Sequence, residues 1–206
     1  MSTAHDPISL FDEWFQAASR VGLPEPSAAA LATAGPDGRP SVRMVLVRGA
    51  DPEGFVFYTN LESRKGLELH RSRECGTGSG GSGTPASLCF YWPPLARQVR
   101  IEGTAIPVTS AEADAYWATR PRPSQIAAWA SPQSRPLPGG RAELERRFAE
   151  MDRKFADSTV PRPPHWSGFR VVPERIEFWE GRENRLHDRL LFRREGGSWT
   201  LETLAP

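Results

Sequence analysis

The sequence has few of the residues that crosslink small domains or hold metals. Its 206 residues include only 2 cysteines, Cys75 and Cys89, and 4 histidines, and none of them has the spacing of a metal site. This excludes a disulfide framework, and we predict that no metal is bound. A chain of this length can bury a sizeable core, so we predict a single domain over residues 1–206.

Long apolar runs and an excess of charge of one sign are also missing. No run of about 18 apolar residues occurs, and the N-terminus has no apolar signal core, so we expect no membrane span and a reducing, cytoplasmic setting. Lys+Arg total 26 against 25 for Asp+Glu, a formal net charge of +1. Such a chain has no overall field to attract nucleic acid or an anionic membrane, so any anion binding must be local.

Turn signals divide much of the chain into strand-like runs. Gly35-Pro36-Asp37-Gly38 separates residues 28–34 from 41–49, and another turn precedes residues 55–59. No helical pattern intervenes, which indicates an antiparallel meander. Further strands are expected at residues 87–92, 98–108, 169–179, 186–193 and 199–204. We therefore predict a mainly β, α+β fold: an antiparallel barrel with helical excursions.

Four helices are expected between or before these strands. Asp6-Pro7 resembles an N-cap followed by proline, and Thr109 with Glu112 forms a capping box for residues 111–119. Apolar spacing predicts further helices over residues 62–73 and 141–156.

The glycine-rich stretch at residues 74–85 interrupts this pattern. It contains Gly76-x-Gly78-x-x-Gly81, the spacing of a dinucleotide fingerprint, but no apolar strand precedes it and no helix follows. We interpret it as a flexible insertion.

Three basic side chains recur near the C-terminus with period-2 spacing. If residues 185–189 are extended, Arg185, His187 and Arg189 share one face. Such a row is unfavourable unless an anionic or electron-rich group lies against it, which indicates half of a binding site. A charged edge strand that blocks aggregation explains the row equally well.

Two earlier segments also carry cations in positions that suit an anion. Arg43 and Arg48 bracket an apolar strand and fall on opposite faces, because their separation is odd. Ser63-Arg64-Lys65-Gly66 stands at a predicted helix start, where backbone N–H groups favour an anion. When each segment is considered alone, the simpler interpretation of the first is a buried strand with charged ends. That of the second is an exposed basic turn.

Tyr116 and Arg120 lie one helical turn apart, with Ser124 just beyond. A phenol, a guanidinium and a hydroxyl can clamp a phosphate, although Tyr116 in a core and Arg120 at a helix C-terminus would also explain the spacing. Two separate basic groups, each with hydroxyls, indicate two phosphates: one on a cofactor and one on a substrate.

The chain resembles the pyridoxine/pyridoxamine 5′-phosphate oxidases in a series of ordered motifs. They are Arg43-Met-Val-Leu-Val-Arg48, Phe57-Tyr-Thr-Asn60, Ser63-Arg-Lys-Gly66, Phe90-Tyr-Trp92, Arg97-Gln-Val-Arg100, Ser124-Gln-Ile126, Ala128-Trp-Ala-Ser131, Gln133-Ser134 and Arg185-Leu-His-Asp-Arg189. The resemblance covers nearly the whole chain outside the glycine-rich stretch. It implies an FMN-binding split β-barrel that works as a homodimer with sites at the subunit interface.

The resemblance also implies a role for each matching residue. FMN would be held by Arg43, Met44, Val45, Leu46, Val47, Arg48, Tyr58, Thr59, Arg64, Lys65, Gln98, Gln133, Ser134, Trp179 and Arg189. The substrate phosphate would contact Arg48, Tyr116, Arg120 and Ser124. Arg185 and His187 would cover the pyridine ring, bind substrate and act as the catalytic residues.

The implied reaction is oxidation of pyridoxamine or pyridoxine 5′-phosphate to pyridoxal 5′-phosphate. Hydride passes from C4′ to FMN, O₂ reoxidises the flavin and yields hydrogen peroxide, and the amine also releases ammonia. Arg48 stands where lysine is common in the family, and Ala127 stands where glycine is common, so its methyl group could crowd the following loop. The alternatives are a flavin oxidase of phenazine biosynthesis and a non-catalytic split barrel that binds flavin or haem.

Overall fold

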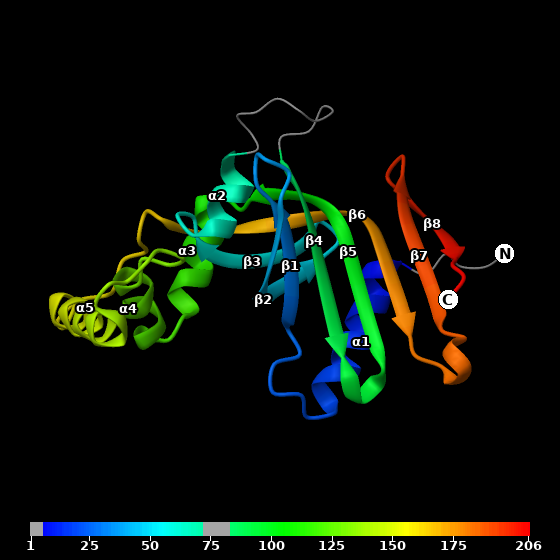
Figure 1. Cartoon of the computed structure of the whole chain (residues 1–206), viewed down its shortest axis with the longest axis horizontal. Helices are drawn as coiled ribbons and strands as arrows, with labels where there is room; N and C mark the ends of the chain where they lie inside the picture. Colours follow the sequence, from blue (N-terminus) through cyan, green and yellow to red (C-terminus); the bar gives the residue numbers. More distant parts are fainter. Residues whose placement is uncertain (1–5, 72–82) are drawn as a thin grey trace.

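The computed structural model describes residues 6–71 and 83–206, in which antiparallel strands form one sheet that closes on itself (Figure 1). The strand order is β3-β2-β1-β4-β5-β6-β7-β8. An additional pairing of β3 with β6 closes the first six of these into a barrel, and β7 and β8 extend the sheet beyond it. The strands are β1 (Ala28–Ala34), β2 (Pro40–Asp51), β3 (Gly54–Asn60), β4 (Thr84–Trp92), β5 (Arg97–Pro107), β6 (Trp166–Glu180), β7 (Asp188–Glu195) and β8 (Ser198–Thr203). The predicted antiparallel barrel with helical excursions is confirmed.

Five α-helices accompany the sheet in the described residues. They are α1 (Pro7–Arg20), α2 (Arg64–Arg71), α3 (Ser110–Thr119), α4 (Arg122–Ala130) and α5 (Gly140–Lys154). The Asp6 carboxylate caps α1 by accepting hydrogen bonds from the backbone N–H groups of Ile8 and Ser9, at 3.4 and 3.0 Å. Thr109 and Glu112 form the predicted capping box at the start of α3. Both predicted helix starts are confirmed because these side chains satisfy free N–H groups of the first turn.

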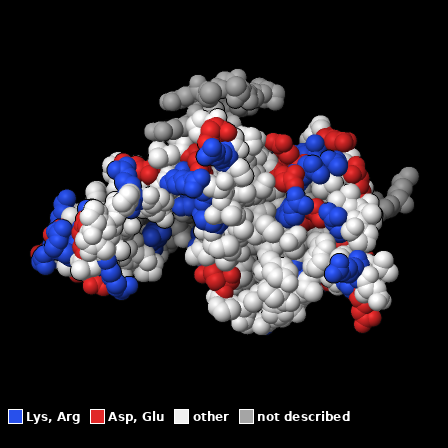
Figure 2. Space-filling model, viewed as in Figure 1, with Lys and Arg blue, Asp and Glu red and all other residues white. Residues whose placement is uncertain are grey.

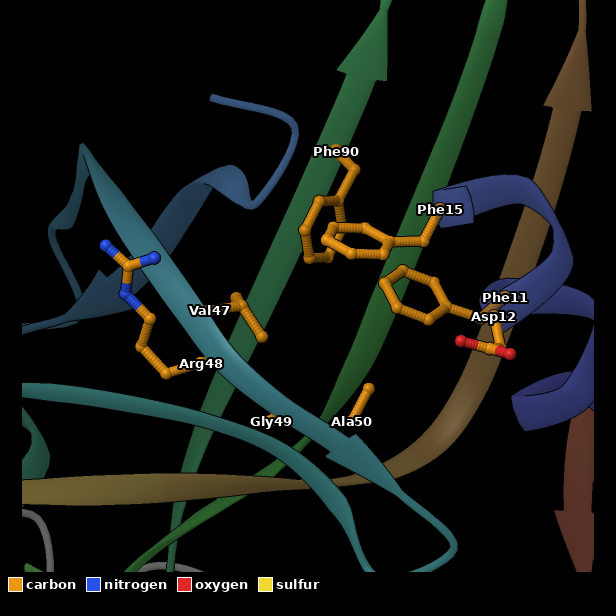
Figure 3. A pocket seen from close by; sticks show the side chains of 8 residues that line it. All are labelled: Phe11, Asp12, Phe15, Val47, Arg48, Gly49, Ala50 and Phe90. Carbon is orange, nitrogen blue, oxygen red and sulfur yellow. The ribbon is translucent and has the colours of Figure 1, made fainter. Parts of the chain in front are cut away.

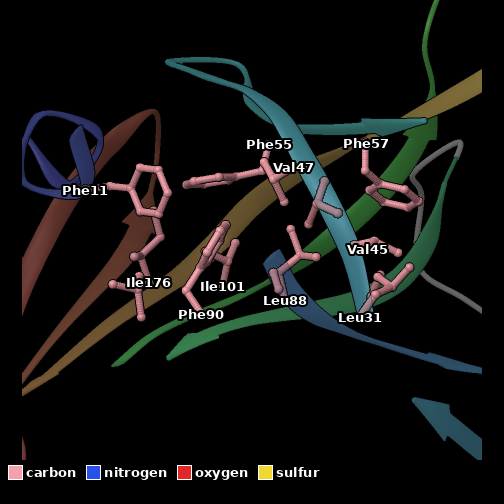
Figure 4. Close-up of a cluster of buried hydrophobic side chains, with 14 of the residues drawn as sticks. Phe11, Leu31, Val45, Val47, Phe55, Phe57, Leu88, Phe90, Ile101 and Ile176 are labelled. Carbon is pink, nitrogen blue, oxygen red and sulfur yellow. The ribbon is translucent and has the colours of Figure 1, made fainter. Parts of the chain in front are cut away.

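The barrel interior holds the main hydrophobic core (Figure 4). The ring of Phe11, on α1, packs edge-on against Phe55 and Phe90, with centroids 4.9 and 5.1 Å apart. Val45 and Val47 of β2 point into this core, while the intervening residues of the strand are exposed. The alternation places Arg43 and Arg48 on opposite faces of β2, as their odd spacing predicts.

A second core lies under the helices α3, α4 and α5, which gather at the end of the molecule away from β7 and β8 (Figure 1). Its buried members are Trp117, Ile126, Phe155, Val160 and Trp166. The indole N–H of Trp117 donates to the carbonyl of Val160 at 2.8 Å, which satisfies the polar atom of a buried ring.

The strand predicted from residue 186 begins later than expected. Asn184 and Arg185 have φ of 55° and 62°, a left-handed conformation, and Arg185 ends the short 3₁₀ turn η2 (Glu183–Arg185). β7 therefore starts at Asp188. The prediction that Arg185, His187 and Arg189 share the face of one strand is wrong, because a turn occupies the first half of that segment.

The predicted insertion at residues 74–85 lies mostly outside the described residues. Its last two positions, Thr84 and Pro85, already form the start of β4 and pair with Ala105 and Thr104 of β5. The flexibility of the rest stays a prediction.

Basic and acidic side chains are interspersed over the surface seen in Figure 2, with no broad field of one sign. Within residues 6–71 and 83–206, no helix is both long and apolar enough to cross a membrane. The same part of the chain contains no group of three or more His, Cys, Asp or Glu side chains that could hold a metal ion.

Candidate functional site

A hollow of about 220 Å³ lies where β2 and β3 meet α2 and α3. It is lined by Met44, Val45, Leu46, Arg48, Tyr58, Thr59, Lys65, Tyr116, Arg120 and Gln133. All of these are site residues predicted from the sequence. They come from segments up to 89 residues apart (44 to 133), so the fold brings together positions that sequence alone could not place side by side.

The lining of this hollow fits an anionic ligand with an apolar part. It contains three cations, Arg48, Lys65 and Arg120, and neither aspartate nor glutamate. Arg48 also lies 3.8 Å from Glu25, outside the lining, but the lining itself has an excess of positive charge, which favours an anion. Met44 and Leu46 present exposed apolar side chains on the β2 side, and Val45, whose side chain points into the core, borders the hollow between them.

Lys65 is a buried cation at the start of α2. Its side chain is held by two hydroxyls: Nζ donates to Thr59 Oγ1 at 3.2 Å and to Ser63 Oγ at 3.5 Å. Burial and then the neighbouring charge of Arg43 lower the pKa of Lys65, while Glu68 opposes that shift. A phosphate at this position would stabilise the charged form of the lysine.

Three aromatic rings stack beside the hollow. The ring centroids of Tyr58 and Tyr116 lie 4.0 Å apart, with an angle of 10° between the planes. Tyr58 also stacks on Trp166, with a centroid distance of 5.4 Å and an interplanar angle of 4°. Burial, followed by the charges of Glu112 and Tyr116, raises the pKa of the Tyr58 phenol. Tyr116 lines the first hollow, and the stack fixes its ring there.

The guanidinium of Arg120 lies against this stack. Its Cζ is 4.9 Å from the centre of the Trp166 ring, and Nη2 donates to the carbonyl of Ser124 at 3.0 Å. Burial lowers the pKa of Arg120, and the charge of Arg48 lowers it further. Arg120 Nε is buried and has no hydrogen-bond partner among the described residues. A buried unpaired donor is costly, so the described residues do not satisfy this guanidinium completely.

A second hollow of about 300 Å³ adjoins the first and shares Tyr58, Arg120 and Gln133 with it. Its other lining residues are Asn60, Ser124, Ala127, Ala128, Ser131 and Trp166. The predicted phosphate clamp is thus divided: Tyr116 faces the first hollow, Ser124 the second, and Arg120 both. Ala127, in α4, is exposed and lines this hollow together with Ser131 and Gln133 of the following loop, and the crowding of that loop by its methyl group stays a prediction.

Four predicted cofactor residues on this side of the protein do not line the first hollow. The side chain of Val47 points into the core near Phe11 and Phe90, where a hollow beside α1 also borders Arg48 (Figure 3). Ser134 follows Gln133 with φ of 67°. Arg43 and Arg64 instead bind Glu68, at 3.2 and 2.9 Å.

The remaining predicted residues form a separate group at the far end of β6. Gln98, Trp179 and Arg189 are direct neighbours across β5, β6 and β7. The His187 ring lies 4.7 Å from that of Trp179, and its Nδ1 accepts a hydrogen bond from the backbone N–H of Arg182. Because β3 pairs with the opposite end of β6, this group and Arg185 lie away from the two hollows of the same chain.

Three residues near the site escaped the sequence analysis. Glu68 contacts two predicted cofactor arginines, and Trp166 supports Arg120. Asn60 lines the second hollow. The spacing of Arg64 and Glu68, four residues apart at a helix start, was the available signal for Glu68. Trp166 lies 46 residues after Arg120, so no local pattern connects the two.

Comparisons with known proteins identify the family of this chain. The family model for pyridoxamine 5′-phosphate oxidase matches residues 15–155. The model for the C-terminal dimerisation region of pyridoxine 5′-phosphate oxidase matches residues 166–206.

Two similar relatives are both named pyridoxine/pyridoxamine 5′-phosphate oxidase. That of Rubrobacter xylanophilus is 56% identical over 201 residues, covering 98% of this chain and 87% of the relative. That of Rhodospirillum rubrum is 55% identical over 206 residues, covering 98% of this chain and 96% of the relative.

Solved structures show the same fold. The structure of PhzG from Burkholderia lata 383, in complex with tetrahydrophenazine-1-carboxylic acid, superimposes with a TM-score of 0.86 at 36% identity, covering 100% of this chain and 95% of that one. A related FMN binding protein from Nostoc punctiforme gives a TM-score of 0.76 at 20% identity over the whole of both chains, which supports the fold alone.

Proposed function

This chain belongs to the pyridoxamine 5′-phosphate oxidase family, and on that premise we propose that it oxidises pyridoxamine or pyridoxine 5′-phosphate to pyridoxal 5′-phosphate. FMN is the proposed cofactor and O₂ the acceptor, with hydrogen peroxide released and ammonia formed from the amine. The observation that carries this proposal is the first hollow, whose lining contains three cations, no carboxylate and only predicted site residues.

The proposed cofactor fits the chemistry of this lining. The FMN phosphate would lie near Lys65 and the start of α2, and Met44, Val45 and Leu46 would border the flavin. When bound, FMN supplies a two-electron acceptor that O₂ can reoxidise. The protein then has to orient the substrate and exclude water, so strong acids or bases are not required of it.

The substrate phosphate is proposed to bind at Arg120. The guanidinium of this residue and the hydroxyl of Tyr116 offer donors, and Arg48 adds a second positive charge. Ser124, across Arg120 in the adjoining hollow, completes the proposed clamp. Because Trp166 and the Ser124 carbonyl already hold the guanidinium, little side-chain entropy remains to be lost when the phosphate binds.

A homodimer is proposed because the second group of predicted residues lies away from both hollows. Gln98, Trp179, Arg185, His187 and Arg189 of one subunit would complete the hollow of the other. Four of these five fall within residues 166–206, the segment that matches the dimerisation region. In this arrangement Arg185 and His187 cover the pyridine ring and hold C4′ towards the flavin. A cytoplasmic location stays a prediction from the sequence.

The proposal is tested with the purified full chain under air. The bound chromophore should be released by denaturation and identified as FMN, and added pyridoxamine 5′-phosphate should yield pyridoxal 5′-phosphate and peroxide in equal amounts. Arg120→Ala should raise KM for the phosphorylated substrate by at least about tenfold, since a hydrogen bond to a charged group is worth about 1.5–3 kcal/mol.

PhzG supplies a competing enzymatic candidate, because its structure superimposes closely on this chain. Oxidation of a reduced tricyclic carboxylic acid, with no turnover of pyridoxamine 5′-phosphate, would overturn the vitamin B6 assignment. A flavin-containing protein that oxidises neither compound would support a binding role alone.

A further inference from the structure

Glu68, on α2, connects two strands and a helix around one carboxylate. Its side chain is 9% exposed, and it accepts hydrogen bonds from Thr33 of β1 at 2.5 Å and from Ser41 of β2 at 2.6 Å. Thr33 and Ser41 are directly paired in the β1–β2 hairpin. The register of the hairpin therefore presents two hydroxyls to one carboxylate on the neighbouring helix.

The same carboxylate binds two arginines, one through each oxygen. Oε1 accepts from Arg64 Nε at 2.9 Å, and Oε2 accepts from Arg43 Nη2 at 3.2 Å. Thr33 and Ser41 also accept from the Arg43 guanidinium, as does the carbonyl of Leu31. Burial alone would disfavour the charged form of Glu68, but the hydrogen bonds from Ser41, Thr33 and Arg64 and the charge of Arg43 lower its pKa to about 2.

The surroundings of Glu68 carry more positive charge than it neutralises. Arg43, Arg64 and Lys65 supply three positive charges around this one carboxylate, and the pKa of Lys65 responds to both Arg43 and Glu68. Arg64 remains 63% exposed in its side chain while its Nε is fixed by Glu68. Its terminal nitrogens are therefore oriented yet accessible, which suits a phosphate ligand.

We propose that Glu68 is a positioning residue for the cofactor phosphate: it fixes Arg43 of β2 and Arg64 of α2 relative to each other and so sets Lys65 at the hollow. This inference rests on the proposed function, since it assumes that a phosphorylated flavin binds here. Glu68 need not touch the phosphate. It acts by holding the arginines and the start of α2 against the β1–β2 hairpin.

The direction in which FMN affinity changes when Glu68 is substituted distinguishes positioning from simple electrostatics. Glu68→Gln removes one negative charge, so electrostatics alone would tighten the binding of FMN. Loss of positioning would weaken it. Riboflavin, which has no phosphate, measures whether the rest of the flavin site is intact.

The experiment titrates the flavin-depleted full chain with FMN and with riboflavin, following flavin fluorescence. For Glu68→Ala the Kd for FMN should rise roughly tenfold or more, with the Kd for riboflavin within about twofold of the unmodified protein, as expected for loss of charged hydrogen bonds to the phosphate. Glu68→Gln keeps the shape and part of the hydrogen bonding, so its Kd for FMN should lie in between. If Glu68→Ala fails to fold, the Kd values of Glu68→Gln for FMN and riboflavin test the inference.

Glu143→Gln is the matched control. Glu143 also binds an arginine one helical turn away, Arg147, but it lies on α5 and lines neither hollow. The Glu143→Gln variant should bind FMN with the same affinity as the unmodified protein. Equal losses for FMN and riboflavin in the Glu68 variants, or FMN binding that is unchanged or tighter, would overturn the inference. Absence of FMN binding by the unmodified protein would overturn the proposed function and this inference with it.

Discussion

The rings of Tyr58 and Tyr116 stack face to face, with centroids 4.0 Å apart and planes at 10°. Tyr58 lies on β3 and Tyr116 on α3, so the stack attaches a residue of the proposed phosphate clamp to the barrel wall. Tyr116→Phe should preserve the stack and leave Tm nearly unchanged, while raising KM for pyridoxamine 5′-phosphate because the hydroxyl is lost. Tyr116→Ala should also lower stability, since an aromatic pair is worth about 0.5–1.5 kcal/mol beyond its burial. Steady-state kinetics and thermal unfolding measure both effects, and an unchanged KM in Tyr116→Phe would remove the hydroxyl from the clamp.

Gly66 allows α2 to begin close against the preceding loop. A Cβ at this position would lie 2.3 Å from the carbonyl oxygen of Leu61 and 2.6 Å from that of Asn60. Gly66→Ala should therefore destabilise the protein by about 1–3 kcal/mol, even though alanine favours helices, because backbone atoms must move. Gly49→Ala is the control, as its Cβ would meet Val56 at an ordinary 3.7 Å. Thermal unfolding should show the larger decrease in Tm for Gly66→Ala, and an equal or smaller decrease would contradict the account.

The low pKa of Glu68 predicts how stability depends on pH. Its pKa falls from 4.5 to about 2 on folding, so its ionised form contributes stability that is complete above pH 4.5 and lost as the pH falls towards 2. The difference in unfolding free energy between the unmodified protein and Glu68→Gln should therefore be larger at pH 6 than at pH 3. Denaturant titrations at both values measure this difference. If the difference in unfolding free energy stays constant with pH, ionisation of Glu68 does not contribute to stability.

Mixed subunits test whether each site needs two chains. Arg120→Ala alters the hollow and Arg185→Ala alters the second group, so each homodimer should have little activity. After the two variants are unfolded together and refolded, random pairing should restore about a quarter of the wild-type sites, because each mixed dimer contains one intact site. Activity is measured with pyridoxamine 5′-phosphate. No recovery in refolded mixed dimers would place both residues in the site of one chain.

Local patterns in the sequence were sufficient for most of the fold. Asp6, Thr109 and Glu112 cap helices through contacts within four residues, and the Gly35–Gly38 turn sets the hairpin of β1 and β2. These signals are short-range, so a single sequence contains them in full. The strand pattern predicted a barrel, but it could not show which strands close it, because β3 and β6 pair across more than 100 residues.

The site was predicted unevenly for the same reason. The resemblance to the family assigned a role to every residue that lines the first hollow. The extended conformation considered for residues 185–189 was wrong, because Asn184 and Arg185 adopt positive φ. Asn184 tolerates this conformation, but asparagine is a weaker turn signal than glycine, and Arg185 is no turn signal at all. Glu68 and Trp166 escaped notice because their partners lie on other elements, across contacts that only the folded chain reveals.

The most direct test of the central claim is anaerobic reduction of the purified, flavin-loaded protein by pyridoxamine 5′-phosphate, followed in the visible spectrum. The flavin absorbance should bleach on addition of about one equivalent of the substrate and return when air is admitted, with one peroxide and one pyridoxal 5′-phosphate formed for each flavin. An oxidised flavin spectrum that persists after the substrate is added would contradict the assignment of this chain as an oxidase of phosphorylated B6 vitamers.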